Sequence, residues 1–340
     1  MQETYAIIWF GLLGVLLIGY TILDGFDFGV GILHPLAKSD RDRRVLMNSI
    51  GPLWDGNEVW LVTFGGALFA AFPDAYATVF SAFYVPFMLL LVALIFRAVS
   101  LEFRSKMKFG RWRGIWDWGF FGSSLLAAFL LGAAGGRTML GIRLDNAMRA
   151  EVGLMDWLHP IPLLVGAMTV ALFAMHGAIF LLLKTDGELR ETVRGWAKTA
   201  FACFAALYVV VTIIVVVMAP RATAIFDMHP AFWIVPALNL LAVANIPRAL
   251  HNGSPHYAFF SSSCTIAALA FLFATAMFPN LVVSTTNPAW SITLFNGCSS
   301  EKTLKLMLII ACIGMPFVLA YTATVYWVFR GRVQLDEASY

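Results

Sequence analysis

Apolar stretches of roughly 20 residues recur along the chain, and short polar connections separate them. A helix of that length crosses the hydrocarbon core of a bilayer, which is about 30 Å thick. Nine stretches qualify: residues 5–33, 50–72, 77–97, 115–135, 160–183, 199–219, 230–250, 258–279 and 305–329. Because a backbone in lipid must satisfy its own hydrogen bonds, the pattern predicts an all-α integral membrane protein with nine transmembrane helices.

The connections between these stretches are too short to hold a soluble domain. We therefore expect one transmembrane domain over residues 1–340, arranged as two four-helix bundles plus one peripheral helix. The longest connections, residues 136–159 and 280–304, are expected to act as covers or docking surfaces. Gly25 and Gly29 lie four residues apart in the first stretch and predict a GxxxG face for close helix packing.

The distribution of basic residues predicts the orientation of the chain. If the N-terminus lies outside, the inner connections carry most of the 23 Lys and Arg residues, including those within 38–44, 97–113 and 184–198. Cytoplasmic loops of membrane proteins carry an excess of Lys and Arg. We therefore expect the N-terminus outside and the C-terminus in the cytoplasm.

Composition agrees with a membrane protein. The chain has 60% hydrophobic and 13% charged residues, and its mean hydropathy is +0.79, whereas soluble domains carry about 25% charged residues. The basic connection at residues 101–113 fits contact with anionic lipid headgroups and gives no indication of nucleic-acid binding. No phosphate-binding or dinucleotide-binding motif is present, and the four cysteines form no CxxC pair.

Acidic side chains interrupt the first two apolar stretches. Asp24 and Asp27 lie in ILDGFDFGVG, and Asp55 and Glu58 lie in GPLWDGNEVW. A charged side chain at the bilayer centre costs at least ~2.5 kcal/mol, so such residues usually face a protein or water-filled interior. Both pairs fall toward the inner side, and the spacing of three residues places each pair on one helix face.

Arg97 closes the third apolar stretch at its inner end and is the expected counter-charge for these acids. Several carboxylates in a medium of low dielectric cannot all stay ionised, so a group of this kind can exchange protons. The alternative is a buried ion-pair network that only fixes the packing of the first three spans. The sequence leaves both interpretations open.

His176 lies in the inner half of the fifth stretch, in FAMHGAIF, where a haem ligand or a proton relay could lie. A haem with two histidine ligands needs a second histidine that faces the first. The other five histidines lie at the ends of the stretches or in connections: His34, His159, His229, His251 and His256. We therefore expect no haem ligand and no metal ligand in this chain, and we keep His176 as a candidate relay.

The runs DGFDFGVGIL, GPLWDGNEVWL and LIFRAVSLEFR, together with nine spans in 340 residues, resemble subunit II of the cytochrome bd-type quinol oxidases. The resemblance is strongest over residues 20–105. It implies a heterodimer in the cytoplasmic membrane of a bacterium or archaeon that oxidises quinol at the outer side and reduces dioxygen to water. Protons for that reaction come from the cytoplasm, so a proton-motive force arises without pumping.

The resemblance also implies cofactors and partners. Two haems b and one haem d are held by subunit I, which is the main partner, and a small single-span accessory subunit is a further candidate. Membrane lipids complete the set. Some members of the family hold a structural quinone in subunit II, and the sequence leaves open whether this chain does. It also leaves open the choice between ubiquinone and menaquinone.

Residue roles follow from the same resemblance. The role in a cytoplasmic proton pathway falls on Asp55 with its neighbour Trp54, and with less support on Glu58, Asp24 and Arg97. Asp27 belongs to this candidate pathway because it shares the buried stretch with Asp24.

Trp60, farther along the same motif, is the candidate for a hydrophobic route that brings dioxygen to haem d. Aromatic side chains would give such a route a dry wall.

Two other functions were compared with an oxidase subunit. A proton-coupled secondary transporter would use the same acids, but such transporters commonly have two similar halves, and here the acids gather in the first two spans. A purely structural scaffold subunit would leave oxygen consumption normal after Asp55→Asn.

Overall fold

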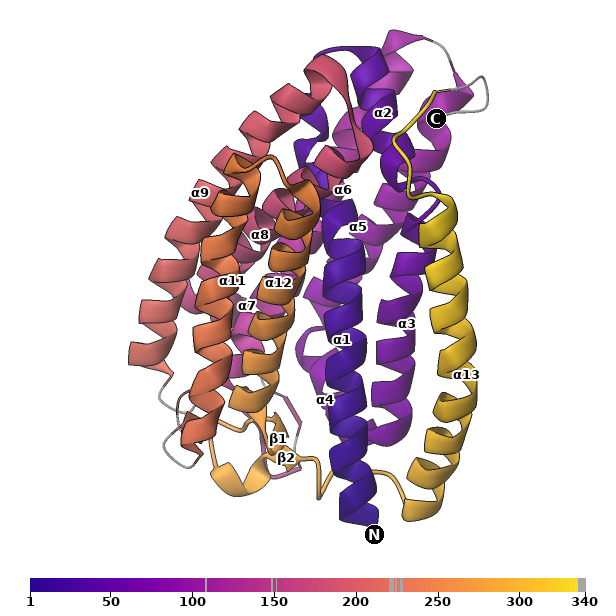
Figure 1. Cartoon of the computed structure of the whole chain (residues 1–340). Coiled ribbons are helices and arrows are strands. Elements are labelled where there is room, and N and C mark those ends of the chain that lie inside the picture. Colours follow the sequence, from indigo (N-terminus) through magenta and orange to yellow (C-terminus); the bar gives the residue numbers. More distant parts are fainter. Residues whose placement is uncertain are drawn as a thin grey trace.

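The computed structural model describes residues 1–107, 109–147, 149–150, 152–219, 223, 225–226 and 229–335. Its long helices lie alongside one another in one bundle, and α1 and α13 begin at the same end (Figure 1). We call this end the predicted outer end, and the opposite one the predicted inner end.

The chain folds into helices with one small hairpin. The α-helices are α1 (Gln2–Leu33), α2 (Asp40–Ile50), α3 (Trp54–Ala71), α4 (Pro73–Ala82), α5 (Tyr84–Phe103), α6 (Gly110–Leu140), α7 (Leu154–Trp157), α8 (Pro160–Lys184), α9 (Gly187–Met218), α11 (Ile234–His251), α12 (Pro255–Met277) and α13 (Glu301–Val328). Short 3-10 helices are η1 (His34–Leu36), η2 (Arg104–Lys106), η4 (Pro230–Trp233) and η5 (Pro288–Trp290). Strands β1 (Asn280–Val282) and β2 (Ile292–Thr293) pair antiparallel.

The all-α membrane class is confirmed. In the described part of the chain, eight helices are long and apolar enough to cross a membrane. The predicted span at residues 50–72 corresponds to α3, which is not among the eight. Its first two turns carry Asp55, Asn57 and Glu58. The count of nine spans, the two four-helix bundles and the orientation of the termini stay predictions.

The predicted third span at residues 77–97 is wrong in its boundaries. The structure breaks the helix at Phe83, where α4 ends, and α5 then runs on to Phe103. The cause is local: Pro86 has no backbone N–H to bond to the carbonyl four residues earlier, so a continuous helix through this point would lose a hydrogen bond. A second proline, Pro73, opens α4.

Helix α1 lies at the centre of the bundle and contacts α3, α6, α8, α12 and α13. Its closest approach is to α8, where a Cβ on Gly29 would lie 2.8 Å from Cα of Gly177 and would collide with the carbonyl oxygen of Phe173. Only glycine permits this approach. The GxxxG face predicted at Gly25 and Gly29 is therefore confirmed as a packing surface.

The two longest connections form a cover at the predicted outer end. The Ile142 N–H donates to the Val283 carbonyl at 2.8 Å, and the Trp9 indole N–H donates to the Leu304 carbonyl at 3.0 Å. A second apolar core lies beneath them, with Trp9, Phe72 and Leu294 all buried. Residues 148 and 151 of the connection 136–159 and Lys108 of the basic connection lie outside the described residues.

Candidate functional site

Asp24 and Asp27 lie one turn apart on α1, in its predicted inner half, and both side chains are fully buried. Every residue of α1 from Asp24 to Gly31 is buried, so protein instead of water encloses these carboxyl groups. Buried carboxyl groups require compensation by charges or hydrogen bonds.

Arg97 of α5 supplies the compensation for two acids. Its Nη1 lies 2.6 Å from Oδ1 of Asp24, and its Nη2 lies 2.5 Å from Oε1 of Glu58. The guanidinium also lies 4.2 Å from the centre of the Phe28 ring, a cation–π contact. Arg97 is fully buried, so these contacts join α1, α3 and α5 by a charge. The prediction that Arg97 is the counter-charge is confirmed.

Asp27 has a neutral partner instead. The amide of Asn57 on α3 donates to Oδ2 of Asp27 at 2.7 Å and to the Leu23 carbonyl at 3.2 Å. The Tyr326 hydroxyl on α13 in turn donates to Oδ1 of Asn57 at 2.9 Å. We call Asp24, Asp27, Glu58, Arg97, Asn57 and Tyr326 the acidic cluster.

Sequence reasoning missed Asn57 and Tyr326. Asn57 could have been found, because it is the neutral polar residue directly before Glu58 in a stretch that has to enter lipid. Tyr326 gave no signal in the sequence, because it lies 269 positions away from its partner, and tyrosine is common near the ends of transmembrane helices.

Asp55 and Trp54 lie outside this contact network. Asp55 is exposed, and its side chain makes no ion pair or hydrogen bond with any described residue, whereas Trp54 packs half-buried against the core. Glu58, one turn farther along α3, has a side chain that is 25% exposed. The predicted meeting of the two acidic pairs therefore holds for Glu58, while Asp55 points to the surface of α3.

Trp60 is buried between α1 and α3. A Cβ on Gly19 would collide with its indole ring, so the backbone of α1 packs directly against the ring at this glycine. The ring is part of the main apolar core. This placement agrees with an apolar wall, and the role in a dioxygen route stays a prediction.

His176 of α8 is fully buried, and both ring nitrogens are engaged. Nδ1 lies 2.7 Å from the Ser262 hydroxyl on α12, and Nε2 lies 3.1 Å from the Ile22 carbonyl on α1. The ring stacks on Phe259 at 4.8 Å between centroids. His176 therefore ties α8 to α1 and α12, and no hydrogen bond or ion pair joins it to the acidic cluster among the described residues.

A second group of charges lies closer to the predicted inner end. The Asp117 carboxyl group of α6 accepts hydrogen bonds from Arg104 Nε at 2.6 Å and from Arg43 Nη1 at 2.9 Å. His34 Nε2 lies 2.6 Å from the same carboxyl group. His34 and Arg104 each follow a residue of the acidic cluster by seven positions, about two helical turns. These contacts pin the ends of α1, α2, α5 and α6 together.

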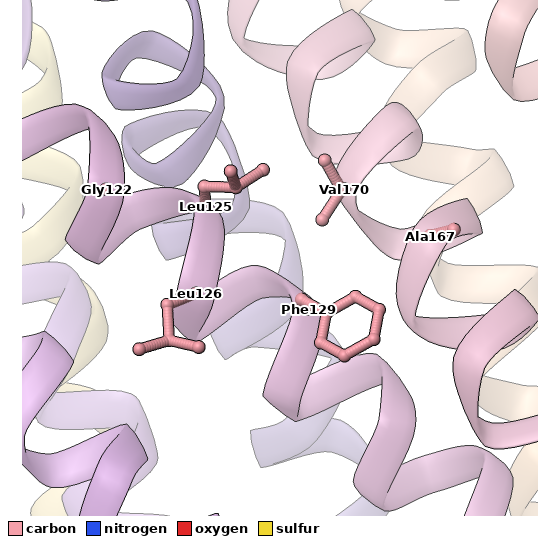
Figure 2. Close-up of a pocket in the computed structure, with 6 residues that line it drawn as sticks. All are labelled: Gly122, Leu125, Leu126, Phe129, Ala167 and Val170. Atoms are coloured by element: carbon pink, nitrogen blue, oxygen red, sulfur yellow. The ribbon is translucent and has the colours of Figure 1, made fainter. Parts of the chain in front are cut away.

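An apolar groove of about 430 Å³ lies between α6 and α8. Figure 2 shows its lining: Gly122, Leu125, Leu126, Phe129, Ala167 and Val170. These side chains offer van der Waals contact to a hydrocarbon chain but no polar side chain to a quinone head group. The groove therefore does not identify a structural quinone site.

Haem ligation by His176 would require one of its ring nitrogens to be free. No group of three or more His, Cys, Asp or Glu residues in the described ranges could hold a metal ion, and both nitrogens of His176 already have partners. We therefore derive no chemical step through a haem in this chain.

The arrangement can hold and release a proton. Asp24 and Glu58 pair with the Arg97 guanidinium, whereas Asp27 accepts a hydrogen bond from the neutral amide of Asn57. Oδ1 of Asp27 is buried and receives no hydrogen bond from the described residues. A carboxyl oxygen in that position is stabilised by carrying a proton itself.

Comparisons with known proteins identify the family of this chain. The profile of the family described as cytochrome bd terminal oxidase subunit II matches residues 5–329. Subunit 2 of the cytochrome bd-I ubiquinol oxidase of Escherichia coli (strain K12) is 36% identical over 366 residues, which cover 98% of this chain and 97% of that protein. Subunit 2 of the cytochrome bd ubiquinol oxidase of Bacillus subtilis (strain 168) is 34% identical over 333 residues, which cover 97% of this chain and 97% of that protein.

A solved structure of bd oxidase from Geobacillus thermodenitrificans contains a chain with the same fold. The TM-score is 0.78 at 17% sequence identity, and the match covers 96% of this chain and 98% of that one. At that identity the likeness shows the fold alone. The match of the family profile and the full-length similarity of the curated relatives carry the assignment: the chain belongs to the cytochrome bd terminal oxidase subunit II family.

Proposed function

We propose that this chain provides part of the proton pathway of a cytochrome bd-type quinol oxidase. Membership of the family makes it a subunit of an oxidoreductase complex and implies a subunit I partner. The observation that carries the proposal is the acidic cluster, in which Asp24 and Glu58 pair with Arg97 while the buried Asp27 is held by the amide of Asn57.

In the proposed mechanism a proton enters from the cytoplasm at the predicted inner end. Asp55 on the exposed face of α3 takes it up, and Glu58, one turn farther along, passes it toward the buried acids Asp24 and Asp27. Trp54 packs against the apolar core beside Asp55 and holds the start of α3 in place. His176 is kept as a relay of lower support, because its partners are a serine and a backbone carbonyl.

The cofactors belong to the partner in this proposal. Subunit I holds two haems b and one haem d, oxidises quinol at the outer side and reduces dioxygen to water. The relatives from Escherichia coli and Bacillus subtilis are named ubiquinol oxidases, which makes ubiquinol the first substrate to test. This chain supports assembly, and Trp60 lines an apolar route for dioxygen.

A proton-coupled transporter is not favoured. The family assignment covers residues 5–329, and the buried acids Asp24, Asp27 and Asp117 all lie in the first half of the described chain, without a matching set in the second half. A scaffold subunit without a proton role is the alternative that the experiment below separates.

The test is Asp55→Asn in the assembled oxidase. The side chain is exposed and makes no hydrogen bond or ion pair within the described chain, and asparagine keeps its shape, so we expect a normal haem spectrum and a normal yield of complex together with slower oxygen consumption. Asp74→Asn is the matched control, because Asp74 is an exposed aspartate near the start of α4 at the predicted outer end. Equal oxygen consumption by wild type, Asp55→Asn and Asp74→Asn would contradict the proposed uptake at Asp55.

A further inference from the structure

We propose that Asn57 and Tyr326 are positioning residues for Asp27, and that through them the last helix controls the proton-holding carboxyl group of the cluster. This inference rests on the proposed function. Neither residue is given a contact with quinol or haem. Their role is exerted through Asp27.

The first step is the position of Asn57. Its Nδ2 donates both to Oδ2 of Asp27 at 2.7 Å and to the Leu23 carbonyl at 3.2 Å. Leu23 lies one turn before Asp27 on α1, so the amide spans that turn of the helix and fixes the carboxyl group against it. Asn57 is 1% exposed, which leaves water little access to these bonds.

The second step is the orientation of the amide. An asparagine side chain can turn by half a revolution and exchange its oxygen and nitrogen. Here Nδ2 faces two acceptors, while Oδ1 accepts from the Tyr326 hydroxyl at 2.9 Å. Each of these contacts favours the same orientation. Without the Tyr326 hydroxyl, the reversed orientation of the Asn57 amide becomes less unfavourable. In that orientation Oδ1 of Asn57, instead of Nδ2, would face Asp27.

The third step is the contrast with the other acids. Asp24 and Glu58 lie within 2.6 Å of the Arg97 guanidinium, which favours their ionised form. Asp27 is held by an amide that serves both forms of the carboxyl group, because Nδ2 can donate to either. Asn57 thus keeps Asp27 out of the ion pair and ready to exchange a proton at Oδ1.

The fourth step is the reach of α13. No residue in its most apolar window is buried, so this helix lies at the edge of the bundle. Tyr326 nevertheless enters the core and meets the Phe26 ring edge-on at 6.4 Å. About one turn beyond Tyr326, the Phe329 carbonyl accepts a hydrogen bond from the buried Lys184 of α8. Lys184 thereby fixes the end of α13 that carries Tyr326.

The experiment is Tyr326→Phe in the assembled oxidase, with Tyr321→Phe as the matched control. Both substitutions remove one hydroxyl from the same helix, but Tyr321 is exposed. Turnover and the Michaelis constant for quinol are measured, and the infrared difference spectrum on reduction reports the C=O stretch of a protonated Asp27. Asp27→Asn identifies that band by its loss.

For Tyr326→Phe we expect a maximal turnover about fivefold lower, the effect of one net hydrogen bond, with an unchanged Michaelis constant for quinol. The Asp27 band should move to higher frequency, because a carboxyl group that loses a donor has a stronger C=O bond. Asn57→Leu, which removes the amide that donates to Asp27, should shift the band further. A role in packing alone would lower the yield of complex without moving the band.

Two outcomes separate this inference from the function on which it rests. If Asp27→Asn slows the oxidase while Tyr326→Phe has the turnover and the band of Tyr321→Phe, the positioning role is overturned and the proposed function stands. If Asp27→Asn leaves turnover unchanged, the proposed function fails first, and the positioning role fails with it.

Discussion

The acids in the first apolar stretch are compensated unequally, and this is the main feature at the scale of single residues. Arg97 binds Asp24 and Glu58 through separate nitrogens of one planar guanidinium. The planar guanidinium presents its N–H donors in a fixed fork, which suits two carboxylates at fixed positions. A single ammonium group has no such fixed geometry. Asp27 is left to a neutral amide. One cation therefore sets different environments for three carboxyl groups.

Substitution of Arg97 tests this dependence. Arg97→Gln leaves Asp24 and Glu58 without a cation in the protein interior, and breaking a buried pair in this way costs about 3–5 kcal/mol. We expect little assembled oxidase from Arg97→Gln and an intermediate yield from Arg97→Lys, which keeps the charge but loses the fork. The measurement is the haem content of the purified complex. Full yields from both variants would show that the ion pairs are dispensable.

Much of this site could be predicted from the residues alone. Asp24, Asp27, Glu58 and Arg97 were identified because charges in apolar stretches are costly, and the structure brings all four together. Asp55 shares their motif but is exposed, since it lies in the first turn of α3, at the end of the helix, where fewer neighbouring helices cover it. Tyr326 depends on packing between the ends of the chain, which local patterns do not contain.

At the scale of helices, apolar length predicted the elements better than their ends. The stretches at residues 160–183 and 305–329 match α8 and α13 closely. Helices α6 and α9 begin earlier than the stretches at 115–135 and 199–219 because polar turns extend them beyond the apolar part. Hydropathy marks the part that fits lipid, while helix ends depend on prolines and caps, as at Phe83 and Pro86.

The close crossing of α1 and α8 holds the acidic cluster in place and can be tested separately. Gly29→Ala would place a Cβ against the Phe173 carbonyl and 2.8 Å from Gly177, so the helices have to separate. We expect destabilisation of about 1–3 kcal/mol, measured as a lower thermal transition of the purified complex. Gly14→Ala on the same helix is the control, because its Cβ would meet no atom within 4 Å. An equal transition for both variants would contradict the crossing.

At the scale of the molecule, the chain is a multi-pass protein of the bacterial inner membrane. Its buried ionisable side chains all lie before residue 185 in the described chain: Asp24, Asp27, His34, Arg97, Arg104, Asp117, Arg137, His176 and Lys184. The most apolar windows of α9 and α11 are only 11% buried, and that of α13 not at all. The charged interior is thus concentrated in the first half of the chain. We propose that the exposed face of α3, which carries Asp55, faces water or subunit I, since lipid would leave that charge uncompensated.

The rate of proton uptake by the Asp27→Asn variant of the oxidase tests the central claim most directly. The assembled oxidase is reconstituted into vesicles, and uptake from the compartment at the predicted inner end is measured during turnover, with Asp74→Asn as the control. We predict uptake slower by about tenfold or more in Asp27→Asn, because a positioned proton carrier is lost, and wild-type uptake in Asp74→Asn. Wild-type uptake and turnover in Asp27→Asn would contradict the claim that the acidic cluster carries protons.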